Sequence, residues 1–163
     1  MKKHILAFPL AFGLALPLGI AGAVAMSSGA MAKTVRLTTT MKSYSGDGAY
    51  LAIYITDAQG KFHSTLRVSG GKAKYHKHLA GWHRGSGGRI DGSTGASVGG
   101  GETLRISVNI ADALIDAGYQ IRIDSAVEDQ RDVPADVVAP LNSSSVGQPT
   151  AGKGYVKSFA FDM

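Results

Sequence analysis

Apolar and polar residues alternate along several short segments of this chain, which is the pattern of half-buried β-strands. β-branched and aromatic residues are frequent in the same segments, and turn residues separate them. The segments with this character are 34–41, 50–55, 62–68, 103–110, 119–127 and 155–161, with a further one at 133–138 that Pro134 interrupts. The pattern therefore predicts about six or seven short strands.

Two details of the pattern predict how these strands are arranged. The turn sequence Asp57–Gly60 joins two of the segments, which are expected to form a β-hairpin. In the last segment, alternation places Tyr155, Lys157, Phe159 and Phe161 on one face. Since no long segment has helical periodicity, the fold class expected is mainly β, a single antiparallel β-sandwich of the immunoglobulin-like kind.

A glycine-rich stretch interrupts the strand pattern in the middle of the chain. Glycine occurs nine times in the 21 positions from Gly81 to Gly101. Such a stretch is expected to be a long functional loop rather than a regular helix or strand, because glycine favours irregular backbone and lets the chain approach a ligand closely. The preceding segment 74–84 is expected to be a short helix or an irregular loop.

The N-terminal residues have the three parts of a secretory leader. Lys2 and Lys3 supply positive charge, an uncharged and mostly apolar run follows, and Ala30-Met31-Ala32 fits a cleavage site, with Ala23-Val24-Ala25 as a competing one. The expected organisation is a signal peptide over 1–32 and one domain over 33–163, exported and without stable membrane insertion after cleavage.

The composition of the mature chain excludes several classes of chemistry. Removal of 32 of the 163 residues leaves 131, with 15 basic against 12 acidic residues, a net charge of +3. This bias is too small and too scattered to predict nucleic-acid binding. The absence of cysteine excludes disulfides, iron–sulfur clusters and thiolate catalysis.

A motif within the glycine-rich stretch resembles the acceptor site of bacterial flavin transferases. These enzymes take FMN from FAD and esterify its phosphate to a Thr or Ser hydroxyl. The family pattern is matched by Asp91, Thr94, Gly95, Ala96 and Ser97, and the departure is Ser97 where Thr is commoner. The resemblance implies a covalent FMN on Ser97; the alternative is an ordinary turn, for which this composition is also typical.

Aromatic and basic residues precede the motif and are candidates for holding a flavin. Tyr75 or Trp82 is expected to stack on the ring. The phosphate or the reduced ring is expected to meet a basic residue, for which the candidates are Lys74, Lys77, Arg84 and Arg89. The competing interpretation is a metal site built from three histidines of the same region, His76, His78 and His83. Trp82 can also be read as a core residue.

The order of these features is similar to that of the DUF2271 family of predicted periplasmic proteins. The resemblance is carried by the hairpin over 50–68, Gly70–Tyr75, Leu79–Arg84, the motif Asp91–Ser97 and the strand pair over 104–124. It implies a sandwich-like β domain, a periplasmic location, and partnership with a flavin transferase and a PepSY-type membrane reductase.

The function expected from the sequence is that of an exported covalent-FMN electron-transfer protein, a redox carrier rather than a stand-alone enzyme. Two alternatives remain open at this point. One is a cofactor-free periplasmic binding or assembly module, and the other is a histidine-based metal-binding protein.

Overall fold

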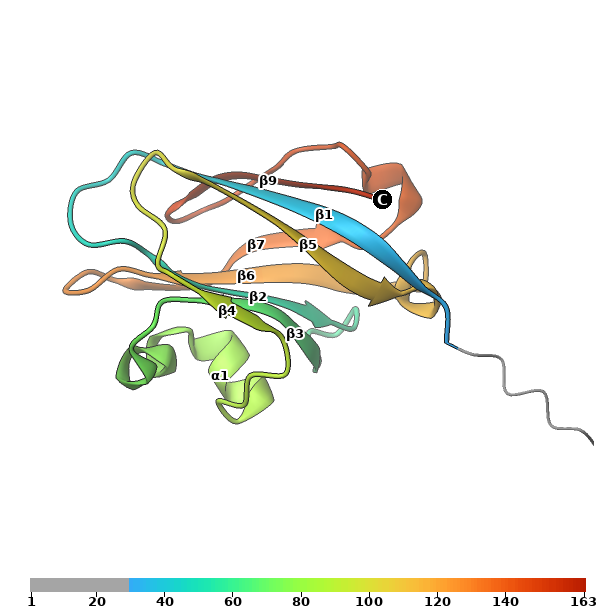
Figure 1. The fold of residues 1–163 in the computed structure, drawn as a ribbon, viewed down its shortest axis with the longest axis horizontal. Helices are drawn as coiled ribbons and strands as arrows, with labels where there is room; N and C mark the ends of the chain where they lie inside the picture. Colours follow the sequence, from blue (N-terminus) through green and yellow to red (C-terminus); the bar gives the residue numbers. More distant parts are fainter. Residues whose placement is uncertain (1–29) are drawn as a thin grey trace, which may run out of the picture.

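The computed structural model describes residues 30–163, which form two β-sheets packed face to face (Figure 1). The sheets have the strand orders β5-β1-β9-β8 and β4-β3-β2-β6-β7. The strands are β1 (Ala32–Met41), β2 (Tyr50–Thr56), β3 (Phe62–Ser69), β4 (Ser93–Gly95), β5 (Thr103–Ala111), β6 (Gln120–Ala126), β7 (Asp132–Pro140), β8 (Thr150–Ala151) and β9 (Val156–Asp162). The expected mainly β fold is confirmed, including each strand predicted from the sequence; the immunoglobulin-like strand order stays a prediction.

The remaining elements are short helices. They are the 3₁₀ helices η1 (Ala73–His78), η2 (Asp112–Leu114) and η3 (Ser143–Ser145) and the α-helix α1 (Ala80–Ser86). The leader predicted over 1–32 lies outside the described residues except for its last three. Among the described residues, no helix has the length and apolar character needed to cross a bilayer.

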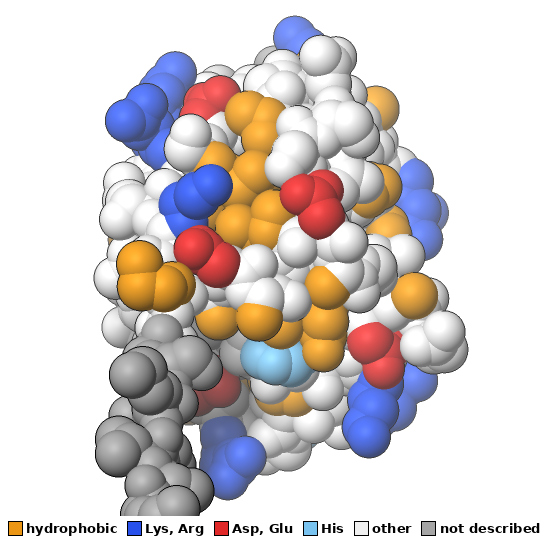
Figure 2. Space-filling view, turned by 90° about the vertical axis from the view of Figure 1, so that its right-hand side faces the viewer, with side chains coloured by type: hydrophobic (Ala, Val, Ile, Leu, Met, Phe, Trp, Pro, Cys, Tyr) orange, Lys and Arg blue, Asp and Glu red, His pale blue; other side chains and the backbone are white. Residues whose placement is uncertain are grey.

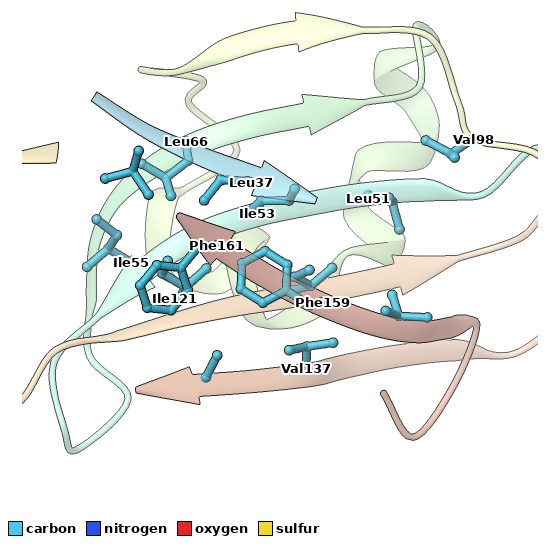
Figure 3. Packing of buried hydrophobic residues seen from close by; sticks show 14 of the residues in the cluster. Leu37, Leu51, Ile53, Ile55, Leu66, Val98, Ile121, Val137, Phe159 and Phe161 are labelled. Atoms are coloured by element: carbon cyan, nitrogen blue, oxygen red, sulfur yellow. The ribbon is translucent and has the colours of Figure 1, made fainter. Parts of the chain in front are cut away.

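The main core lies between the two sheets and follows from the alternation in sequence. Leu37, Phe159 and Phe161 of the four-stranded sheet are buried in one cluster with Ile53 and Ile121 of the other sheet (Figure 3). Such side chains contribute about 1.5–3 kcal/mol each when they leave water. This core fixes the ends of the strands, from which the loops of the candidate site extend.

Strand β2 is buried on both faces, which explains its nearly continuous apolar sequence. Leu51 and Ile53 point into the main core, whereas Ala52 and Tyr54 belong to a second cluster with Trp82. Trp82 lies on α1, which covers the outer face of the five-stranded sheet (Figure 1). The helix is therefore held by burial of one aromatic residue against the sheet.

The closing strand does not keep the alternation expected for it. Phe159 and Phe161 are buried, but Lys157 is exposed and Val156 is buried in its place. The pairing with β1 shifts at this point, because consecutive residues of β1 pair with Ser158 and then with Val156. Lys157 is thus the extra residue of a β-bulge, which reverses the faces beyond it.

The glycine-rich stretch is not the single long loop that the sequence predicts. It contains most of α1 and the whole of β4, which pairs in parallel with β3. The glycines serve close packing: a Cβ at Gly92 would lie 2.5 Å from the carbonyl oxygen of Thr65. The helix ends at Gly87, whose φ of 64° suits glycine. Tertiary pairing with β3 therefore orders a segment whose composition predicts irregular backbone.

Candidate functional site

The motif Asp91–Ser97 is fastened along the edge of the five-stranded sheet. Its middle part is β4, and hydrogen bonds hold both flanks. The backbone N–H of Thr65 donates to Asp91 Oδ1 over 3.0 Å, and the N–H of Gly70 donates to the Gly95 carbonyl over 2.8 Å. The segment is thus an ordered edge of the sheet, presented to solvent.

Ser97 is exposed, and the residue after it is buried in the main core. Val98 pairs with Ala49 through two backbone hydrogen bonds of 2.7 and 3.0 Å, and its side chain joins the cluster that contains Leu51 (Figure 3). The Tyr44 hydroxyl also donates to the Val98 carbonyl over 2.6 Å. Because Val98 is anchored, the Ser97 hydroxyl is held in a defined place at the surface.

Two glycines in and beside the motif lie in close contact with neighbouring side chains. A Cβ at Gly48 would lie 2.7 Å from Ser97 Oγ. A Cβ at Gly95 would fall on the guanidinium of Arg67, 2.6 Å from its Cζ. Neither glycine has a positive φ, so each is needed here for space rather than for its backbone conformation. Position 48 therefore packs against the Ser97 side chain, and position 95 packs against Arg67.

Asp91 is ionised at neutral pH and orients the start of the motif. Its burial raises the pKa of the carboxyl, but hydrogen bonds from Thr65 and from the Asp91 backbone, together with the charge of Arg89, outweigh it. The pKa of Asp91 consequently lies below its ordinary value of 3.8. The carboxylate anchors the segment to β3.

A pocket of about 270 Å³ opens beside η1, next to the end of β6. Tyr50 and Tyr75 form an aromatic part of its wall, with ring centroids 5.6 Å apart and edge to face. The Tyr75 hydroxyl donates to Glu128, and the ammonium of Lys74 lies 4.7 Å from the Tyr75 ring centroid. The rest of the lining is mostly polar or acidic and comprises His78, Ala126, Val127, Glu128, Asp129, Gln130 and Asp132.

The pocket and the Ser97 segment lie at the same end of the molecule. The N–H of Gly70 is bonded to Gly95, and a Cβ at Gly70 would fall on the ring of Tyr50. Gln130 of the pocket donates to the Ser45 carbonyl over 2.7 Å, in the loop that continues to Gly48. The loops before β2, before β5 and between β6 and β7 meet at the left in Figure 1.

The opposite end of the molecule, where β1 begins, faces the viewer in Figure 2. Apolar side chains gather in the middle of this face, next to a histidine, and acidic and basic groups surround them. His63 and Tyr119 stack there edge to face at 5.3 Å. This face lies far from the motif and from the pocket beside η1.

Two of the flavin-binding residues expected from the sequence lie away from the motif. Trp82 is 0 % exposed; its backbone N–H donates to Asp124 and its Nε1–H to the Thr65 hydroxyl. It is the core residue of α1, so the expected stacking on a flavin is wrong. Arg84 is exposed beside Phe62, at the end of β3 remote from Gly70. Tyr75 lines the pocket beside η1, whereas Arg84 lines a different hollow beside Phe62.

The three histidines are not brought together as metal ligands. His76 hydrogen-bonds to the Gly70 carbonyl, His78 pairs with Asp132 at 3.0 Å, and His83 lies edge-on to Trp82. Residues 73–78 form a 3₁₀ helix, in which side chains two positions apart do not share a face as they would in a strand. Over residues 30–163, no group of three potential metal ligands forms.

Sequence reasoning missed several residues around Ser97. Gly48 and Arg67 are in contact with the motif only because β3 and the loop before β2 reach it in the fold. Tyr50 and Glu128 line the pocket although they are distant in sequence. Arg67 occupies a polar position in an alternating strand, which ordinarily indicates a solvent-facing side chain.

Comparison with known protein families gives one match. The family model described as predicted periplasmic protein (DUF2271) matches residues 32–158. Comparison with curated proteins gave no match, and neither did comparison with solved structures. The family description confirms the expected periplasmic location. Because the match spans most of the chain, the protein belongs to the DUF2271 family of predicted periplasmic proteins.

Proposed function

We propose that this domain carries FMN as a phosphoester on Ser97 and relays electrons in the periplasm. Its electron donor is a PepSY-type membrane reductase, and its acceptor is an oxidised compound, for which ferric chelates are a candidate. The observation that carries the proposal is the position of Ser97: the residue is exposed, while Gly95 and Val98 on either side are hydrogen-bonded into the sheets.

The covalent step needs a hydroxyl that a second enzyme can reach. The Ser97 oxygen attacks the FMN-side phosphorus of FAD, the pyrophosphate bond breaks and AMP leaves. The hydroxyl proton passes to a base of the flavin transferase, and no oxidation or reduction takes place. Ala96 and Ser97 are both exposed, so the acceptor segment is open to solvent.

The pocket beside η1 is the part of the surface that suits a flavin ring. Tyr50 and Tyr75 offer aromatic surface, and the Tyr75 ring is fixed through its hydroxyl by Glu128. Such a group supplies the redox chemistry when bound, while the protein supplies its position and electrostatic surroundings. The carboxylates of the lining disfavour additional negative charge in the pocket, which tends to lower a flavin's reduction potential.

Intact-mass measurement after co-expression with an active flavin transferase in an exporting host tests the proposal. Wild-type protein should gain the mass of one FMN less one water, and Ser97→Ala should gain none. Ser93→Ala is the matched control, because Ser93 is an exposed hydroxyl in a free position of the motif. Wild-type protein that stays unmodified, beside a verified substrate that is modified, would contradict the proposal.

A further inference from the structure

Arg67 projects from β3 across the acceptor segment. Its guanidinium occupies the space that a side chain at position 95 would fill, with Nη2 nearest to where that Cβ would be. The backbones are joined at this place, since Arg67 pairs with Ser93 and Ser69 with Gly95 in the parallel β3–β4 ladder. The guanidinium therefore lies on the motif itself.

The charge of Arg67 has no acidic partner within the described residues. Its Nε lies 3.5 Å from Ser69 Oγ, a long hydrogen bond, and the ion pair found over residues 30–163 is the one between His78 and Asp132. The side chain is half-buried. A partly desolvated guanidinium whose terminal nitrogens are free is suited to an anion with two oxygens, such as a phosphate.

We propose that Arg67 binds the phosphate carried on Ser97; this rests on the proposed function. Gly95 and Ser97 are two positions apart in sequence, so their Cα atoms are at most about 7 Å apart. The Arg67 guanidinium, which packs against Gly95, can therefore reach a phosphate esterified to Ser97 Oγ. Its two terminal N–H groups donate to the two free phosphate oxygens and balance the single negative charge of the diester.

Four other basic residues lie against groups outside the motif. Lys72 and Lys74 lie over the Tyr75 ring, at 5.6 and 4.7 Å from its centroid. Arg122 donates to Gln120, and Arg84 is at the other end of β3. Gly95 thus has a defined role, because the absence of its side chain lets the Arg67 guanidinium lie beside the acceptor.

The test compares FMN transfer into purified variants, using isolated transferase and FAD, with intact mass followed over time. Arg67→Met should load about tenfold to a hundredfold more slowly than wild type, since a charge-assisted hydrogen bond is lost. Arg67→Lys should recover part of the rate, because it restores the charge without the bidentate geometry. Thermal unfolding of each variant verifies that it is folded.

A second variant acts on the same contact while keeping the arginine. Gly95→Ala should displace the guanidinium and slow loading, whereas Gly71→Ala should load normally, since a Cβ at Gly71 meets nothing within 4 Å. If Gly95→Ala acts through Arg67, it should have no further effect in the Arg67→Met background. An additive effect would mean that the alanine obstructs the transferase directly, and would count against the proposal.

Phosphorus NMR of the loaded proteins gives a readout independent of the transfer rate. The phosphodiester resonance should differ between wild type and Arg67→Met, and the difference should shrink in high salt. An unchanged resonance together with a wild-type loading rate in Arg67→Met would overturn the assignment of Arg67 and leave the acceptor role of Ser97 intact. Failure of the wild-type protein to take up FMN at all would overturn both the assignment of Arg67 and the acceptor role of Ser97.

Discussion

Gly48 faces Ser97 so closely that a Cβ at position 48 would come within 2.7 Å of the serine oxygen. These two residues lie 49 positions apart in sequence and are brought together by the pairing of Ala49 with Val98. The loop before β2 therefore determines how much space the Ser97 hydroxyl has. This relationship gives the first prediction.

Gly48→Ala should slow FMN loading by at least about tenfold, corresponding to ~1.4 kcal/mol in the barrier. The new methyl group pushes the hydroxyl from its position, while the backbone at 48 tolerates alanine because φ is not positive. Loading is followed by intact mass. Gly71→Ala is the control, and equal rates for the two variants would show that the crowding at Ser97 has no consequence.

Trp82→Ala should lower the free energy of unfolding by about 3–5 kcal/mol, the usual cost of removing a large buried aromatic residue. The loss comes from the cavity beneath α1 and from the unpaired Thr65 hydroxyl. Urea unfolding measures it. Trp82→Phe, which keeps more of the packing, should leave the absorption spectrum of the loaded flavin unchanged; a shifted spectrum would place Trp82 in contact with the ring.

Asp91 should make wild-type stability depend on pH in the acidic range. Its pKa is lower folded than unfolded, so its contribution is fully present above the ordinary value of 3.8 and is lost as the pH falls through the folded pKa. Asp91→Asn removes that contribution. The difference in unfolding free energy between the two proteins should therefore shrink on acidification, and a constant difference between pH 7 and the acid limit would contradict the assignment.

Glu128→Gln should raise the reduction potential of the loaded flavin by an amount on the order of tens of millivolts. The substitution removes a carboxylate from the pocket lining and retains an acceptor for the Tyr75 hydroxyl. Potentiometric titration of the loaded protein measures the change. Asp116→Asn is the control, because Asp116 lies by Ser143 at the other end of the molecule. Equal potentials in both variants would place the ring outside this pocket.

Alternation predicts the strands because each of them has one face in the core, as β1 and β5 show. It fails at Lys157, where a bulge changes the face, since a bulge depends on the partner strand. The sequence pattern is also misleading between Gly81 and Gly101, where the glycine content predicts one long loop. There the order comes from long-range pairing with β3, which local composition does not encode.

The candidate site is predictable only in part, for the same reason. A local motif singles out Ser97 as a candidate, and the local cluster of aromatic and basic residues includes Tyr75, which lines a pocket in the structure. The same cluster misplaces Trp82, because an aromatic residue on a short helix fits a core as well as a ligand site. Gly48 reaches Ser97, and Arg67 reaches Gly95, through the fold alone, so a sequence without structure assigns them no role.

Strand β4 has a consequence for how a transferase recognises this protein. Its pairing leaves β3 without a long free edge, and the Gly95 carbonyl and both backbone groups of Val98 are already hydrogen-bonded. β4 is itself the edge strand of its sheet, so the motif presents a short strand edge that is already fixed in the fold. We therefore expect a flavin transferase to meet the motif as part of a folded surface, so unfolded or nascent chains with the same residues should be poorer substrates.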